Sequence, residues 1–130
     1  SYNSILGDKS LAFGKRIAKC HKYLLSINKG RILSNQLLRS GTSIGANVRE
    51  GLAAQSRKDF ISKMGIAHKE ARETDYWLDI MFHAGEFTLK EYQSLKADNN
   101  ELMALLTSTI KSSKNGPNPS DSNTMDTDRF

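Results

Sequence analysis

Cysteine, proline and long apolar runs are all scarce in this chain of 130 residues, and each shortage excludes a class of protein. The single cysteine, Cys20, cannot form an internal disulfide, and it cannot supply a cysteine-based metal site. No apolar run approaches the roughly 20 residues that a membrane span needs, and the polar opening residues show no signal peptide. We therefore expect a single soluble domain in the reducing cytoplasm, without membrane attachment.

Proline occurs twice, and both copies lie beyond residue 113. Proline interrupts helices, so its absence from residues 1–113 favours long, unbroken helices in that range. Residues 114–130 have almost no apolar side chains, and we expect them to form a disordered C-terminal tail. The sequence therefore predicts one folded domain at 1–113 and a tail at 114–130.

Apolar side chains in residues 1–113 recur every three or four positions, which is the spacing of amphipathic helices. After a loosely ordered lead-in, the first helix is predicted from about residue 9 to residue 28, with Asp8 as its N-cap. Gly30 is the expected left-handed residue at its end. The second helix is predicted from about residue 32 to residue 54.

Two capping boxes predict where the remaining helices begin. Ser56 is followed three residues later by Asp59, and Thr88 by Glu91, a spacing at which side chains cap backbone amides of the first turn. Gly85 ends the third helix, and the fourth extends to about residue 113. Because short turns join four long helices, and no segment is a credible strand, we predict an all-α, antiparallel up-down-up-down four-helix bundle.

The predicted third helix is apolar on two sides. One regular stripe suits the bundle core, and it consists of Phe60, Met64, Ala67, Ala71, Thr74, Leu78 and Met81. A second stripe lies on a different side and includes Ile66, Trp77 and Ile80. A helix with two apolar sides needs two partners, so we expect this second side to form an oligomer interface through Tyr76, Trp77 and Ile80.

The second helix combines glycines with polar side chains between residues 37 and 51. Gly41 and Gly51 fall in its apolar seam, and a helix that accepts several glycines usually gains a close backbone contact. Four polar residues share another face, which Glu73 of the third helix is placed to meet. The predicted structural polar network consists of Arg39, Ser43, Asn47, Glu50 and Glu73. The alternative is that Arg39 and Arg49 point outward and bind phosphate.

Positive charge is concentrated in the first half of the chain. Residues 1–58 carry eleven Lys or Arg against two acids, a balance of +9, whereas residues 59–113 have a balance of −3. Such a basic half commonly binds nucleic acid through phosphate contacts, which give affinity without sequence readout. The candidate nucleic-acid contacts are Lys15, Arg16, Lys19, Lys22, Lys29, Arg31, Arg49, Arg57 and Lys58. The alternative is that the basic half simply packs beside the acidic half.

Catalytic and metal-binding patterns are missing from the sequence. A carboxylate-bridged metal centre in a four-helix bundle needs Glu-x-x-His motifs, and no Glu here has a His three residues later. Ser40, Ser43 and Cys20 have no nearby histidine that would activate them as nucleophiles. The glycines do not follow a strand, so they do not form a phosphate cradle. We expect no enzymatic activity, no metal and no cofactor.

Two linked motifs resemble the signature of a known family. The first is LRS-x-TSI-x-ANV-x-EG at residues 38–51, and the second is DFI at 59–61, IA at 66–67 and KEA-x-ET-x-YWL at 69–78. Both are similar to motifs of the four-helix-bundle proteins encoded in bacterial ribosomal-RNA intervening sequences, which are ribosomal-protein-like. The resemblance covers residues 8–112, and Glu70 stands where many members have a small residue.

The resemblance implies a small bundle whose fold is similar to the accessory variability determinant of diversity-generating retroelements. That protein assembles as a pentameric barrel with a basic surface and serves a reverse transcriptase and its RNA. By this likeness we expect a non-enzymatic homopentamer that binds RNA or DNA as an accessory factor to a ribonucleoprotein or reverse transcriptase. The alternative is a protein-interaction scaffold whose basic face docks an acidic protein partner.

Overall fold

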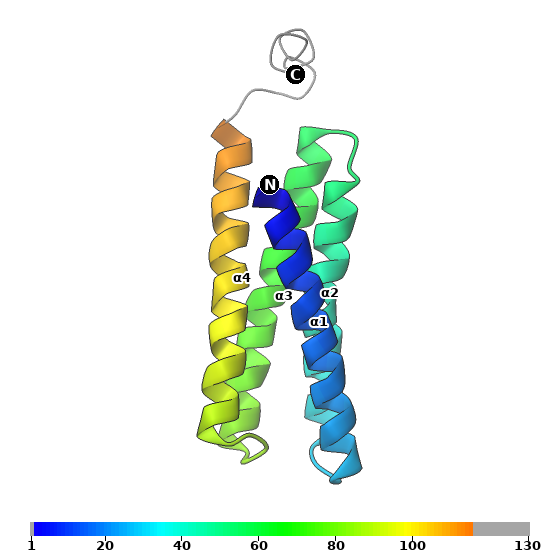
Figure 1. Ribbon diagram of the computed structural model, residues 1–130, viewed down its shortest axis with the longest axis vertical. Helices are drawn as coiled ribbons and strands as arrows, with labels where there is room; N and C mark the ends of the chain where they lie inside the picture. The colour runs from blue at the N-terminus through cyan, green and yellow to red at the C-terminus, as the bar shows by residue number, and fades with distance from the viewer. Residues whose placement is uncertain (1, 116–130) are drawn as a thin grey trace, which may run out of the picture.

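The computed structural model describes residues 2–115, with side chains from Ser4 onward. Its four helices are α1 (Tyr2–Ser26), α2 (Arg31–Leu52), α3 (Arg57–His83) and α4 (Leu89–Asn115). Each helix runs opposite to the one before it, and no strand occurs among these residues (Figure 1). The predicted all-α, up-down-up-down four-helix bundle is confirmed.

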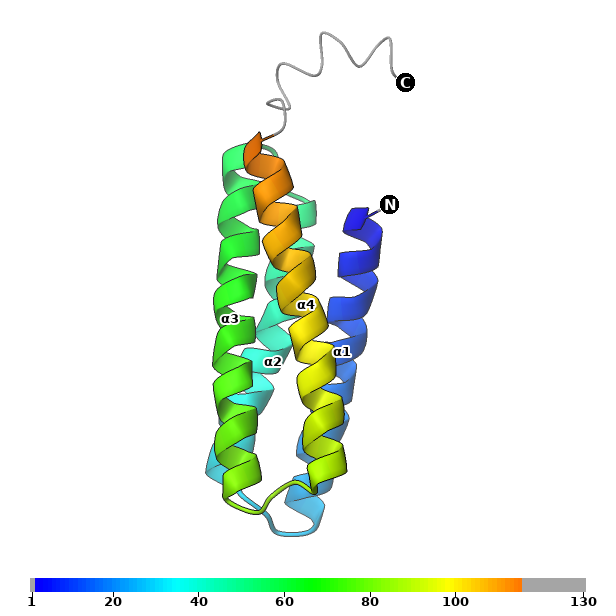
Figure 2. The same ribbon diagram turned by 90° about the vertical axis from the view of Figure 1, so that its left-hand side faces the viewer.

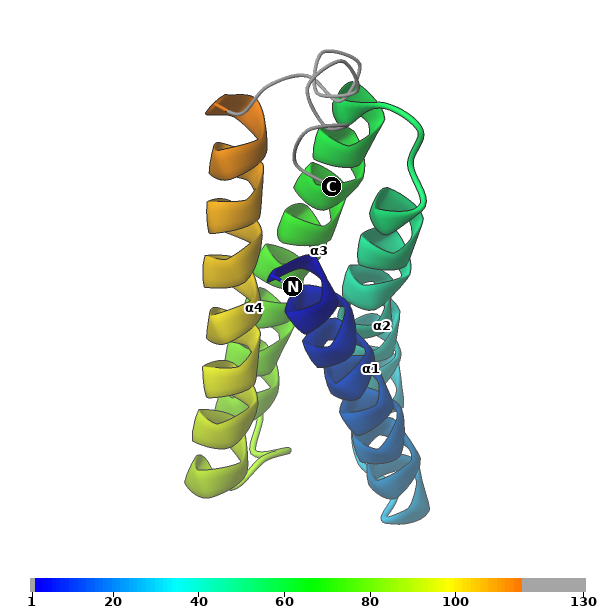
Figure 3. The same cartoon turned by 45° about the horizontal axis from the view of Figure 1, so that its top comes forward.

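The helices pack in chain order around the bundle, and α1 closes it against α4. The contacts of α2 with α1 and α3 are the most extensive, whereas α1 and α4 touch least. The axis of α1 is inclined to that of α4 (Figures 1 and 2), and the first turns of α1 lie between α4 and α2 (Figure 3). In this order, the outer groove between α1 and α2 lies on the opposite side of the bundle from the groove between α3 and α4.

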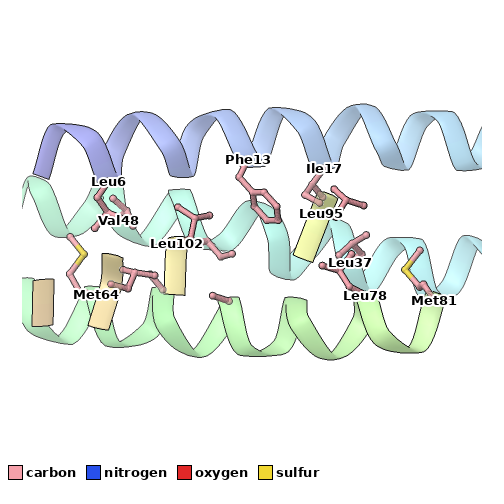
Figure 4. Close-up of a cluster of buried hydrophobic side chains, with 14 of the residues drawn as sticks. Leu6, Phe13, Ile17, Leu37, Val48, Met64, Leu78, Met81, Leu95 and Leu102 are labelled. Atoms are coloured by element: carbon pink, nitrogen blue, oxygen red, sulfur yellow. The ribbon is translucent and has the colours of Figure 1, made fainter. Parts of the chain in front are cut away.

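The core is a column of mostly aliphatic side chains along the bundle axis (Figure 4). The predicted stripe of α3 is confirmed, because all of its members except the half-buried Phe60 are buried. The other helices contribute facing residues that include Leu6, Phe13, Ile17, Leu24, Leu37, Ile44, Val48, Leu95, Leu102 and Leu106. Within residues 2–115, no helix combines the length and the hydropathy that a transmembrane span requires.

The first helix begins earlier than the sequence predicts. α1 starts at Tyr2, so the predicted lead-in before residue 9 is wrong, and so is the N-cap role of Asp8. Leu6 and Ser10 are buried and extend the seam of Phe13 toward the N-terminus at steps of four and three. The sequence reading missed this extension because Gly7, Asp8 and Lys9 follow Leu6, and because Ser10 does not register as apolar.

The turn between α1 and α2 also differs in detail from the prediction. Asn28 has a φ of +62°, and the amides of Asn28 and Lys29 donate at 3.2 and 2.9 Å to carbonyl oxygens three and five residues earlier. This pairing is a Schellman motif, so Asn28, and not Gly30, is the left-handed residue that ends α1. Gly30 is left-handed as well, with a φ of +42°, but it serves as the N-cap of α2.

The starts of α3 and α4 and the end of α3 follow the prediction, whereas α2 ends at Leu52, two residues before the predicted end. The Asp59 amide donates to Ser56 Oγ at 3.1 Å, and Thr88 and Glu91 cap each other at 2.8 and 3.1 Å. Gly85, with a φ of +82°, ends α3 as expected. α4 continues to Asn115, past the predicted boundary at 113, and the rest of the predicted tail lies outside the described residues.

The glycines of α2 allow close contact on two sides. A Cβ on Gly45 would lie 3.0 Å from the Ser10 carbonyl oxygen, and one on Gly41 would lie 3.0 Å from the Ile17 side chain. A Cβ on Gly51 would lie 2.8 Å from Met64 Cε of α3. A Cβ at Gly45 would press on the backbone of α1, whereas the neighbours of Gly41 and Gly51 are side-chain atoms that would have to shift. The predicted close contact is confirmed.

Candidate nucleic-acid interface and the polar contacts around it

Three of the predicted nucleic-acid contacts form a stripe on α1. Lys15, Lys19 and Lys22 are exposed, and the described part of the chain offers none of them a hydrogen bond or an ion pair. At spacings of four and three residues they lie on one side of the helix, within about 11 Å along its axis. An uncompensated lysine stripe of this kind attracts polyanions.

Arg16 points away from this lysine stripe and contacts α4. Its Nη1 donates to Asp98 Oδ2 at 2.6 Å, and its Nη2 donates to Ser94 Oγ at 2.8 Å. Lys9 and Glu101 form a second ion pair between the same helices at 3.2 Å. These contacts join α1 to α4 where the helices touch least, so Arg16 serves the bundle and leaves three lysines in the stripe.

Arg49 lies with Lys15 at the edge of a groove between α1 and α2. This α1–α2 groove has a volume of 540 Å³, and Asp8 is the one carboxylate among its lining residues. Leu11 and Leu52, which also line it, are each 41% exposed. Between them lie small residues: Gly7, Gly14, Ala18, Gly45 and Ala46. Lys15 of the lysine stripe therefore borders a shallow apolar groove, whereas Lys19 lines a pocket between α1 and α4.

The remaining predicted contacts are dispersed. Arg31 is exposed at the first turn of α2, and Lys29 Nζ donates to the Gly85 carbonyl oxygen at 3.4 Å. Arg57 and Lys58 begin α3, where they line a cavity of 420 Å³ together with a lysine of α4. The structure therefore divides the predicted contacts between opposite sides of the bundle and does not gather them into one surface.

The predicted polar network is centred on Arg39, which joins α2 to α3. Its guanidinium donates to both carboxylate oxygens of Glu70, at 2.9 and 3.3 Å, and also to Glu73. Trp77 Nε1 donates to Glu73 Oε2 at 3.1 Å. The bonds to Glu70 and Glu73 raise the pKa of Arg39, while the bonds from Trp77 and Arg39 lower the pKa of Glu73 in spite of partial burial.

Glu70 is the member of this network that sequence reasoning missed. Its side chain is only 11% exposed, so its charge depends on the bidentate Arg39 more than that of Glu73 does. The missed signal is spacing, because Glu70 precedes Glu73 by three residues and therefore lies on the same side of α3.

Three predicted members do not join the network through their side chains. Ser43 Oγ donates to the Arg39 carbonyl oxygen at 2.6 Å, and Asn47 Nδ2 donates to the Ser43 carbonyl oxygen at 2.8 Å, both within α2. Glu50 pairs with Lys63 of α3 at 3.5 Å, farther along the same helix pair. Ser43 and Asn47 therefore bond backbone groups one turn away, and Glu50 bonds a side chain outside the network.

The buried polar contacts between helices involve other residues. Thr74 Oγ1 of α3 lies 3.0 Å from Ser40 Oγ of α2, and Asn99 Nδ2 of α4 donates to the Ala71 carbonyl oxygen at 2.9 Å. Ser40, Thr74 and Asn99 are all fully buried. Because a misaligned partner would leave a buried polar group unpaired, these contacts favour one register of the helices.

The predicted oligomer interface is only partly available at the surface. Tyr76 is 56% exposed, and its ring meets that of Trp77 edge to face at a centroid distance of 5.0 Å. Trp77 itself is half-buried against the core of its own bundle, and Ile80 is half-buried as well. Tyr76 is therefore the most accessible of the three residues.

The side chains considered as a nucleophile or as metal ligands are not arranged for either role in the described residues. Burial raises the pKa of the Cys20 thiol to about 11, and Glu91 adds to this effect, so the thiol is protonated at neutral pH. Within residues 2–115, no group of three or more His, Cys, Asp and Glu side chains is arranged to hold a metal ion.

Comparison with known proteins places the fold and its motifs in a family. The family model of the 23S rRNA-intervening sequence protein matches residues 3–108, which include both motifs. No curated protein matches the chain. A crystal structure of a protein of unknown function, from the S23 ribosomal protein family of Bacteroides thetaiotaomicron VPI-5482, is 47% identical with a TM-score of 0.83, over 85% of this chain and 99% of that chain. The chain belongs to the 23S rRNA-intervening sequence protein family.

Proposed function

We propose that this chain is a non-enzymatic cytoplasmic protein that associates with structured RNA or DNA. The observation that carries the proposal is the stripe of Lys15, Lys19 and Lys22, which no acidic side chain of the described residues neutralises. Arg49 extends the positive charge across the α1–α2 groove. Phosphate groups would supply the missing counter-charge, and contacts of this kind position a backbone without reading its bases.

We further propose that the protein acts as a homo-oligomer, and that the subunit number is five, as the family resemblance implies. Exposed Tyr76 and Ile66 on the outer side of α3 are suitable contact residues. A closed ring would repeat the lysine stripe, and repeated weak contacts to one nucleic acid strengthen binding. Such an assembly would serve as an accessory factor to a ribonucleoprotein or a reverse transcriptase.

Filter binding to a structured RNA over a series of salt concentrations tests the nucleic-acid proposal. The variant K15Q/K19Q/K22Q loses three phosphate contacts. The slope of log binding constant against log salt concentration should therefore become less steep by about two to three, since each contact contributes roughly 0.7–0.9 to it. The matched control is K69Q/K90Q, which removes exposed lysines of α3 and α4 outside the stripe. Wild-type protein that fails to bind at low salt, or binds independently of salt, would contradict the proposal.

The oligomer proposal is tested by light scattering and native mass spectrometry. Tyr76→Ser should lower the mass of the assembly with little change in melting temperature, because this side chain is largely exposed. Trp77→Ala should affect both quantities, because its ring packs on the core and its Nε1 bonds Glu73. An unchanged mass in both variants would place the subunit contact elsewhere.

A protein-interaction scaffold is the second candidate function, and the α1–α2 groove favours it. A groove of 540 Å³ with a floor of glycine and alanine admits the side chains of an approaching helix, and its cationic edge suits an acidic partner. Charge reversal of Lys15, Lys19 and Lys22, followed in both RNA-binding and protein pull-down assays, separates the candidates. Loss of a specific acidic protein, with RNA binding unchanged, would favour the scaffold.

A further inference from the structure

Two adjoining cavities lie between α3 and α4, at the end of the bundle where α3 begins and α4 ends. Figure 2 shows these two helices side by side at that end. The cavities have volumes of 420 and 500 Å³, and both are lined by Ile61 and Lys114. They form one continuous depression, which we call the α3–α4 groove. It lies on the opposite side of the bundle from the lysine stripe of α1.

The α3–α4 groove is lined by four cations and by no carboxylate. Arg57 and Lys58 come from α3, and Lys111 and Lys114 come from α4. Only Lys111 of the four lies in residues 59–113, whose balance is −3, because Arg57 and Lys58 belong to the basic residues 1–58 and Lys114 follows residue 113. No carboxylate lines the groove beside these cations, because the paired carboxylates of α3 and α4 contact other helices or lie farther along the bundle.

Several of these carboxylates have identified partners away from the groove. Glu70 and Glu73 bind Arg39 on the α2 side of α3. Asp75 and Asp79 bind Lys96 at 2.5 and 2.8 Å, nearer the other end of α3. The α4 carboxylates Asp98 and Glu101 pair with α1. No ion pair of the described residues involves the four cations of the groove.

Arg57 has a guanidinium that is not fully paired within the described part of the chain. Its Nη2 is buried and has no hydrogen-bond partner, although a buried guanidinium nitrogen normally has one. The start of α3 is beside it, where the Asp59 amide is capped by Ser56 and the amides of Arg57 and Lys58 have no partner among the described residues. An anion bound at the start of α3 would lie next to Arg57 and Lys58 and face the positive end of the α3 dipole.

We infer that the α3–α4 groove binds the sugar–phosphate backbone of a nucleic-acid strand, as a second contact surface opposite the lysine stripe. This inference rests on the proposed function. The segment of α3 that lines the groove, residues 57–68, is about 16 Å long at 1.5 Å per residue. The four cations cluster at the end of this segment where α3 begins and α4 ends, so they would contact a short stretch of the strand's phosphates.

The composition of the groove favours nucleic acid over an acidic protein. Interfaces that bind proteins tightly are anchored by aromatic side chains in pockets, and no aromatic residue lines this groove. Its lining includes Ile61 and Ile110, and His68 Nε2 of α3 lies 3.1 Å from Thr107 Oγ1 of α4. Without an aromatic platform for bases, the groove is expected to bind duplex and single strands through phosphates alone.

Gly65 provides a clean test, because it lines the groove and a Cβ there would meet nothing within 4 Å. Gly65→Glu places a carboxylate among the cations, and Gly65→Gln adds a side chain of the same size without charge. Fluorescence anisotropy of a labelled duplex RNA should show that Gly65→Glu binds about tenfold or more weakly, since like charges at an interface are costly. Gly65→Gln should bind within about twofold of the wild type, since its added side chain carries no charge.

A second variant, K58Q/K111Q/K114Q, tests the groove without using Gly65. The slope of log binding constant against log salt concentration should become less steep by about two to three in this variant. Circular dichroism should show unchanged helix content. If RNA binding depends on Lys15, Lys19 and Lys22 but not on either groove variant, the proposed function stands and this inference is overturned. Displacement of the RNA from the groove by poly-glutamate at equal charge concentration would also overturn it, in favour of an acidic protein.

Discussion

The α1–α2 groove and the α3–α4 groove lie on opposite sides of one bundle, and each contains a glycine with a different role. Gly45 lies against the backbone of α1, and a Cβ there would be 3.0 Å from the Ser10 carbonyl oxygen. Gly65 faces open space. The first glycine is required by the packing of two helices, whereas the second only leaves room above a helix. The same residue type therefore marks a helix contact in one groove and an accessible surface in the other.

Charge separates the two grooves in a way that segment totals do not predict. The α1–α2 groove belongs to the basic half of the chain, yet its lining includes Asp8 beside Lys15 and Arg49. The α3–α4 groove combines Arg57 and Lys58, from the basic residues 1–58, with Lys111 and Lys114 near the end of α4, and no carboxylate lines it. Local surface charge depends on which side of a helix each residue occupies. A segment's net charge does not contain that information.

The largest loss of stability, and the strongest test of the difference between Gly45 and Gly65, is expected from Gly45→Leu. A leucine at this position cannot fit against α1 without separating the helices, and we expect a loss of about 3 kcal/mol or more, at the upper end of the cost of overpacking. Urea unfolding followed by circular dichroism measures it. The matched control is Gly65→Leu, which should fold normally. An unchanged melting temperature and assembly mass for Gly45→Leu would show that the close contact is not required.

The second largest effect is expected from Arg39→Ala, which acts on the α3 carboxylates that lie away from the α3–α4 groove. Arg39→Ala removes the partner of Glu70, whose side chain is 11% exposed, and leaves that carboxylate without its bidentate donor. We expect a loss of stability of about 1–3 kcal/mol, which is the cost of leaving a mostly buried polar group unpaired. Chemical denaturation measures it, and the double variant R39A/E70A should recover part of the loss. No recovery would indicate that Glu70 does not depend on Arg39.

A smaller effect in the opposite direction is expected from Gly65→Ala. Alanine is favoured over glycine inside a helix by roughly 0.5–1 kcal/mol, and nothing in the structure lies close enough to oppose the added methyl group. Thermal unfolding should therefore show a modest rise in melting temperature. A fall in melting temperature would mean that Gly65 is packed against something other than its own bundle, such as a neighbouring subunit.

The smallest effect is a pH response of the Arg39 network, which Trp77 reports as the only tryptophan of the chain. Hydrogen bonds from Trp77 and Arg39 lower the pKa of Glu73 from its ordinary value of 4.5. The stabilisation by ionised Glu73 is therefore complete above pH 4.5 and is lost as the pH falls through the lowered value. Trp77 fluorescence should change below pH 4.5, and at higher pH in Arg39→Ala than in the wild type. An identical pH response in both proteins would show that Arg39 does not lower the pKa of Glu73.

Features with local causes were readable from the sequence. Four helices, two capping boxes, the end of α3 at Gly85 and the buried stripe of α3 all follow from the identities of residues within a few positions of one another. The exceptions were the end of α1, where Asn28 and not Gly30 is the left-handed residue, and the start of α1, where buried Ser10 stands in a core position that a search for apolar residues passes over.

The candidate site was less readable, because partners on other helices decide it. Arg39 and Glu73 were matched correctly from their faces, but Glu70 was missed, and Ser43 and Asn47 bond the backbone of their own helix. Arg16 belongs to the same run of basic residues as Lys15, yet it contacts Asp98 of α4 while Lys15 remains exposed. Nothing in the spacing of α1 identifies the residue that α4 places opposite it.

The sequence by itself determined the helices, their order and the family, because helical period and capping are properties of neighbouring residues. Only the tertiary structure decided where charge accumulates. The rotation and axial offset of each helix against the next direct the carboxylates of α3 and α4 toward Arg39, Lys96 and α1, and leave four cations together in the α3–α4 groove. These offsets result from packing along the whole bundle, and no single segment encodes them.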